Sequence, residues 1–176
     1  MTQKQKSLVE MFIDSLPDEQ KNVFKDIAYY FIELGYVPQK QKVSDFVLSF
    51  KHHMNGKVIA KMGIRKQHGF ISIRFFACKN VPKKYIDALR KDLDARNGQY
   101  STPLSSNPIN MITNKCGYCG SVCTGGGLGY CYKDSDGKEI PRCGAYPIVI
   151  PDVKEADVAE MKNVIFEQHH YFLSIT

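Results

Sequence analysis

The stretch FVLSFKHHMNGKVIAKMGIRKQHGFISIRFFAC, residues 46–78, decides the fold. Apolar and polar residues alternate with a period of two in three successive segments, which is typical of half-buried strands. Asn55-Gly56 lies between the first two segments and is the strongest short signal for a hairpin turn. We expect His68-Gly69 to turn the chain a second time. The stretch therefore predicts a three-stranded antiparallel meander with one apolar face and one polar face.

Helical periodicity precedes this meander. Leu8, Met11 and Phe12 predict a short helix over residues 4–14, and Ser15-Leu16-Pro17-Asp18 combines a helix stop with a new helix start. A second helix is predicted to run to Gly35, on the apolar positions Val23, Phe24, Ile27, Phe31 and Leu34. A polar link containing Pro38 is expected to lead from it to the meander.

Helical periodicity also follows the meander. Pro82 is expected to open a helix that Asn97-Gly98 ends. The sequence YPIVIP, residues 146–151, predicts an additional short strand, and Asp152 with Glu155 forms a capping-box pattern at the start of a final helix. We expect four apolar residues of this helix to face the sheet: Val158, Met161, Ile165 and Phe172.

This order of elements predicts an α+β fold, with a three-stranded or larger antiparallel sheet and helices on one face. Residues 1–98 and 146–176 would form the α+β domain. Residues 99–145 would be a cysteine-rich, metal-binding insert resembling a zinc ribbon.

Composition limits the class of protein. Hydrophobic residues make up 43% and charged residues 24%, as in globular proteins, which argues against wholesale disorder. No apolar run approaches the roughly 20 residues that cross a bilayer, so no membrane association is expected. Glu10 and Asp14 interrupt the first residues, which argues against a secretory signal. We therefore expect a cytoplasmic protein whose six cysteines are thiols or metal ligands.

The cysteines of residues 116–143 have the spacing C-x2-C-x3-C-x7-C-x11-C. In Cys116-Gly117-Tyr118-Cys119-Gly120, two thiolates two residues apart can grip one ion. A three-residue turn centred on Gly137 would place Cys131 directly opposite Cys143, a separation that suits two ligands of one zinc or a disulfide. The predicted zinc ligands are Cys116, Cys119, Cys131 and Cys143, with Cys123 as a substitute. Unliganded thiols, an iron–sulfur cluster and redox disulfides are the alternatives.

Two resemblances accompany these patterns. The C-x2-C-G knuckle with a downstream hairpin resembles zinc-ribbon proteins, which implies a cysteine-liganded structural zinc. The stretch FIDSLPDEQKNVFKDIAYYF, residues 12–31, followed by NGKVIAKMGIRKQHGFISIRFF, residues 55–76, is similar to the opening of YdhG-like small bacterial domains. This second resemblance implies a compact α+β fold, and it transfers no functional residue.

Positive charge is concentrated in one part of the chain. Residues 40–84 contain eleven Lys and Arg against one acid, Asp45, which is +10 within a chain of net charge +6. Alternation places the candidate anion-binding residues on the polar side of the meander: Lys57, Lys61, Arg65 and Arg74. Such a face is either the wetted side of a half-buried sheet or a platform for nucleic acid or another phosphate-bearing ligand.

The histidine pairs have plainer interpretations. We expect His52-His53 to be solvated, and His169-His170 to serve the helix end or to direct one ring at the metal. The sequence thus favours a non-enzymatic zinc-binding module with a basic face for an anionic partner. The alternative is a cysteine-dependent redox or metal enzyme.

Overall fold

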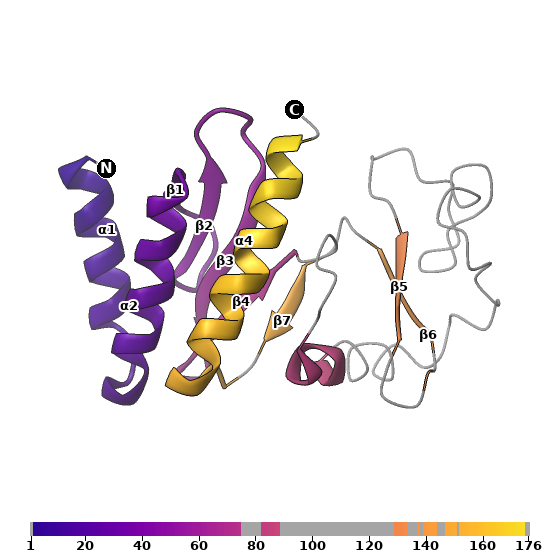
Figure 1. Ribbon diagram of the computed structural model, residues 1–176. Helices are drawn as coiled ribbons and strands as arrows, with labels where there is room; N and C mark the ends of the chain where they lie inside the picture. The colour runs from indigo at the N-terminus through magenta and orange to yellow at the C-terminus, as the bar shows by residue number, and fades with distance from the viewer. Residues whose placement is uncertain are drawn as a thin grey trace. The chain divides into compact units, whose positions relative to one another are not determined.

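The computed structural model describes residues 2–74, 82–88, 129–133, 137, 139–143, 147–150 and 152–174 (Figure 1). The chain divides into two compact units. One unit comprises residues 1–79 with 149–176, and the other comprises residues 80–148.

The first unit is an α+β domain. Its helices are α1 (Gln3–Asp14), α2 (Asp18–Glu33) and α4 (Val158–Ser174), which a 3-10 turn (Glu155–Asp157) precedes. Its sheet has the strand order β1-β2-β3-β4-β7. These strands are β1 (Tyr36–Lys40), β2 (Val47–His52), β3 (Val58–Arg65), β4 (His68–Ile73) and β7 (Ile148–Ile150). Strands β1 to β4 pair antiparallel in sequence order, so the predicted meander is confirmed and has one more strand than expected.

The additional strand is β1, in the segment expected to be a polar link. It pairs with β2 from Tyr36 opposite His52 to Lys40 opposite Leu48. Pro38 is compatible with this position because β1 is the edge strand, where a missing backbone N–H costs no sheet hydrogen bond when it faces outward.

Three helices cover one face of the sheet (Figure 1). The even-numbered residues of β2 point toward this helical layer, and Phe50 packs with Phe31 of α2 at a ring-centroid separation of 4.7 Å. The core contains the fully buried side chains of Phe12, Phe24, Phe31, Leu48, Phe50, Met62, Ile71, Met161 and Ile165. Burial of Met161, Ile165 and Phe172 confirms three of the four expected contacts of the final helix, whereas Val158 is half-buried.

Two local predictions were wrong. The second hairpin turns at Lys66-Gln67, both with positive φ, and Gly69 lies buried inside β4. A Cβ atom at Gly69 would lie 2.6 Å from Cζ of Phe24, so this glycine permits close packing of α2 on the sheet.

The second wrong prediction is the capping pair of Asp152 with Glu155. The capping interaction before α4 joins the Lys154 N–H to Asp157 Oδ2 at 2.8 Å, whereas Asp152 has a φ of 48°.

The second unit contains a helix over residues 83–88 and the hairpin of β5 (Gly129–Lys133) and β6 (Glu139–Cys143). The expected continuation of that helix to residue 97 lies outside the described residues.

Candidate anion-binding sheet face

The sheet face opposite the helices carries a polar row across four strands. The backbone register places Ser49 of β2 opposite Lys61 of β3, and Lys61 opposite Ser72 of β4. Gln39 of β1 stands opposite Ser49. Lys61 is exposed between the buried residues Ala60 and Met62, so strand alternation directs it away from the helices. The row thus has one lysine with a hydroxyl group on each side.

Side-chain hydrogen bonds organise the serine end of this row. The Gln41 amide Nε2 donates to Ser49 Oγ at 2.6 Å, and the Ser49 hydroxyl lies 3.4 Å from the Gln39 carbonyl oxygen. Ser49 and Ser72 are 2% and 5% exposed, so they form the floor from which the Lys61 side chain rises. The backbone positions of the row are consequently set by the sheet, and Gln41, directly after β1, holds the Ser49 side chain.

Two further cations extend the face. Lys51 of β2 is exposed between buried Phe50 and His52. Arg65 ends β3, and its guanidinium carbon lies 5.3 Å from the centroid of the Phe70 ring. That ring covers Gly63, where a Cβ atom would come within 2.6 Å of it. Phe70 therefore brings an aromatic surface to the same face.

The sequences of β1 to β4 contain four Lys or Arg residues and no acid, namely Lys40, Lys51, Lys61 and Arg65. Because no carboxylate in these strands offsets the cations, the sheet presents one sign of charge. A surface of one sign raises the local concentration of an oppositely charged ligand.

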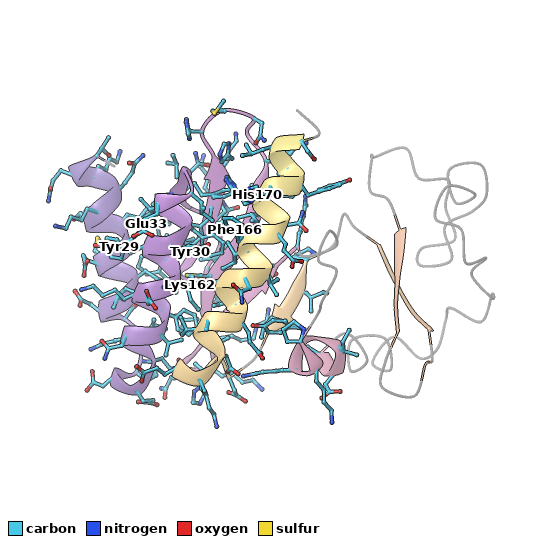
Figure 2. The ribbon with its side chains drawn as sticks, in the orientation of Figure 1. Tyr29, Tyr30, Glu33, Lys162, Phe166 and His170 are labelled. Carbon is cyan, nitrogen blue, oxygen red and sulfur yellow. The ribbon has the colours of Figure 1, made fainter. Side chains whose placement is uncertain are left out.

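The outer surface of the helices is different (Figure 2). Lys162 of α4 donates to Asp26 of α2 at 2.7 Å and lies 5.4 Å from the centroid of the Tyr30 ring. The Tyr29 hydroxyl donates to Glu10 Oε1 at 2.6 Å. On this side cations and acids are interspersed, so the helices do not carry a surface of one charge.

The four predicted anion-binding residues do not all lie together. Lys61 and Arg65 share the polar face. Lys57 precedes β3, and its Nζ atom lies 5.6 Å from the centroid of the Phe172 ring, which brings it beside α4. Arg74 follows β4 and is half-buried, and its backbone N–H donates to the Ile59 carbonyl oxygen at 3.0 Å.

The predicted zinc ligands are described only in part. Cys116, Cys119 and Cys123 lie outside the described residues. Cys131 pairs with Pro141 and Cys143 pairs with Gly129, so the expected direct opposition of Cys131 and Cys143 is wrong by two residues. The cause is the loop: the last pair is Lys133 with Glu139, which encloses five residues where three were expected. Within the described part of the chain, no three His, Cys, Asp or Glu side chains gather to hold a metal.

A buried histidine pair lies between α4 and the sheet. The ring centroids of His52 and His169 are 5.6 Å apart, and that of Tyr36 lies 4.9 Å from His52 and 5.6 Å from His169. His52 is 3% exposed, so its expected solvation is wrong. No described residue provides a hydrogen-bond partner for His52 Nδ1.

Burial lowers the pKa of both histidines. For His52, the charge of His53 also lowers the pKa and a hydrogen bond with the Leu34 backbone acts in the opposite direction. For His169, the charges of His170 and His52 add to the effect of burial. Both rings therefore favour the neutral form more than a solvated histidine does. The burial of His52 was signalled by spacing, because His52 continues the alternation of Leu48 and Phe50.

The chain matches no protein-family model, no curated protein and no solved structure. None of the described helices has the length and apolar character needed to cross a membrane.

Proposed function

We propose that the chain is a non-enzymatic binding module whose sheet face engages a phosphate-bearing partner, with a single strand of nucleic acid as the form to test. The observation that carries this proposal is the polar face of strands β1 to β4, whose sequences contain no acid, with exposed Lys61 between two serines in strand register.

The chemistry of the face suits phosphate groups. Lysine acts as a point charge toward phosphate, and the exposed Lys61 ammonium group carries three N–H donors. Arg65 stands four residues from Lys61, about 13 Å along β3, so the two cations are spaced to meet different phosphates of one strand. The Arg65 guanidinium beside the Phe70 ring offers planar surfaces on which an unpaired base can stack.

A structural zinc is the second part of the proposal. The C-x2-C-G pattern at Cys116 and Cys119 supports it, as does the presence of Cys131 and Cys143 on two paired strands two register positions apart. Bound thiolates would supply the organisation that a segment poor in large apolar side chains cannot obtain from a core.

The proposed function is tested by fluorescence anisotropy with a labelled oligothymidylate between 50 and 200 mM salt. Over this range, added salt should weaken binding that depends on phosphate contacts by about one order of magnitude or more. Lys61→Met and Arg65→Met keep an apolar stem and remove a charge. We expect each to weaken binding about three- to tenfold and to reduce the salt slope by about one.

The matched control is Lys6→Met, because Lys6 is exposed on α1, away from the sheet face. This variant should bind like the parent protein. An affinity that does not change with salt, or an equal loss in Lys6→Met, would overturn the proposal.

A further inference from the structure

A groove of about 680 Å³ runs between α1 and the edge strand β1. Its apolar floor is formed by Leu8 and Met11 of α1 with Val37 and Pro38 of β1. Met11 is 56% exposed, an unusual exposure for a large apolar side chain. The volume is within the range of small-molecule pockets, and the lining is mainly apolar, as in such pockets.

The backbone of β1 argues against an added peptide strand in this groove. The Gln41 N–H donates to Val47 O and the His53 N–H donates to Gly35 O, so odd-numbered residues of this segment bond to β2. The even-numbered residues consequently direct their backbone groups outward. Pro38 is the middle one of these and has no N–H, which is a usual protection of an edge against strand addition.

Among the described residues that line the groove, the charged ones are Lys4 and Lys40, and none is an acid. The Lys40 ammonium lies 4.6 Å from the centroid of the Phe46 ring, which fixes its position. Phe46 in turn packs against Phe12, the neighbour of Met11, at 5.6 Å between ring centroids. A positioned cation therefore lies at the Met11 end of an apolar channel.

We propose that this groove binds a soluble single-chain anionic amphiphile of the fatty-acid class, with its head group at Lys40 and its chain along Leu8 and Val37. The apolar floor requires an apolar ligand, and the acid-free lysine rim requires an anionic head. A recessed channel between a helix and a strand suits a single chain better than a bilayer, which needs a projecting apolar surface. The head-group end of the site is separate from the polar row, because Lys40 and Lys61 point to opposite sides of the sheet. Val37 and Gln39 of the groove stand opposite Lys51 and Ser49, at the β1 edge of the polar face.

The test is calorimetric titration of the full chain with monomeric dodecanoate, dodecanol and dodecyltrimethylammonium. We expect saturable binding of dodecanoate at one site. The neutral and cationic compounds should bind about tenfold or more weakly, because the loss of a hydrogen-bonded charge pair lowers affinity by about that factor. Lys40→Met should weaken dodecanoate binding about tenfold. Lys6→Met, which removes a charge elsewhere on α1, should not.

A second pair of variants tests the apolar floor of the groove without removing the Lys40 charge. Met11→Glu places a carboxylate in the groove at an exposed position and should abolish dodecanoate binding, whereas Met54→Glu alters a residue that is 76% exposed on the β2–β3 turn and should have no effect. The proposal would be overturned if dodecanol bound as tightly as dodecanoate, or if Met11→Glu and Met54→Glu lost equal affinity. It would also be overturned if the chain bound anionic vesicles or an acidic peptide but not dodecanoate. Oligothymidylate binding should be unchanged in Met11→Glu, so the two proposals fail separately.

Discussion

The Nδ1 atom of His169 on α4 lies 3.3 Å from the hydroxyl oxygen of Tyr36 on β1, although 133 residues separate the two positions. His52 of β2 packs against both rings. This contact joins the last helix to the first two strands of the sheet, and its histidines make the junction sensitive to pH.

The first prediction concerns this pH dependence. The folded-state pKa values of His52 and His169 lie below their ordinary value of 6.5, so the unfolded chain binds protons that the folded chain does not. The free energy of unfolding that the two neutral rings contribute is therefore fully present above about pH 6.5. It falls as the pH decreases from there toward the folded-state pKa values. Each histidine adds a slope of at most about 1.4 kcal/mol per pH unit.

Urea unfolding between pH 7.5 and 5 measures this slope, and His52→Phe should flatten it. The neighbours whose charge lowers the pKa values of the pair are His53, beside His52, and His170, beside His169. His68→Phe is the control, because His68 is exposed at the first residue of β4 and is not one of the rings in contact with the pair. A slope equal in His52→Phe and the parent protein would contradict the assignment.

The second prediction concerns the β3–β4 turn. Lys66 and Gln67 have φ of 50° and 65°, which is the left-handed conformation that this type of two-residue turn requires. This conformation is unfavourable for any residue with a Cβ atom. Gln67→Gly should raise the free energy of unfolding by about 0.5 kcal/mol, since relief of strain exceeds the entropy that glycine adds to the unfolded chain. Gly56→Ala, at a φ of 68°, should have the opposite effect. Urea midpoints that fall in both variants would refute the strain interpretation.

The third prediction concerns Gly69. An alanine there would bring its Cβ atom to 2.6 Å from Phe24 Cζ and 2.9 Å from Leu16 Cδ2, both in the core. We expect Gly69→Ala to lower the free energy of unfolding by about 1–3 kcal/mol through overpacking. Gly63→Ala meets the ring of Phe70, which is only half-buried and has room to move, so its loss should be smaller. Chemical denaturation compares the two variants.

The fourth prediction concerns a buried hydrogen bond at the same strand. The Gly69 N–H donates to the Gln20 Oε1 atom of α2 at 2.7 Å in a buried position. Gln20→Leu leaves this N–H without an acceptor and should cost about 1–3 kcal/mol of stability. Gln3→Leu, at an exposed position of α1, is the matched control. Similar thermal midpoints for the two variants would show that the bond has little net value.

The fifth prediction concerns zinc. Elemental analysis of the purified chain should find about one zinc ion, with the ligand thiols protected from alkylation until a chelator is added. Cys119→Ser should release the metal, and Cys78→Ser, outside the cysteine cluster, should retain it. Iron with visible absorption would favour the enzyme alternative, and a metal-free protein with six reactive thiols would refute the zinc proposal.

The sequence predicted the elements whose side chains repeat regularly. The alternation through Leu48, Phe50, Ala60 and Met62 placed β2 and β3 correctly, because burial on one face imposes a period of two. It missed β1, since Pro38 is unfavourable in most strands and tolerable only at an outward-facing edge position, which depends on the rest of the sheet. It also misplaced Cys131 relative to Cys143, because loop length sets register and several lengths suit the same turn residues.

The composition of the sequence located the basic region, but it did not show which of its lysines and arginines lie on which side of the sheet. Lys57 and Lys61 are four residues apart, yet the first lies beside Phe172 and the second on the polar face. A β-bulge intervenes at the pairing of Phe50 and Lys51 with β3, where the register shifts. Such an irregularity changes which side chains share a face, and the residue pattern alone does not locate it.

The measurement that tests the proposed function most directly is amide chemical-shift mapping of the labelled chain during titration with oligothymidylate at low salt. We expect the largest changes at Ser49, Lys61 and Ser72, with the outer surface of α2 and α4 around Tyr30 and Phe166 unaffected (Figure 2). Changes centred on those helices, with the polar sheet face silent, would contradict the proposal.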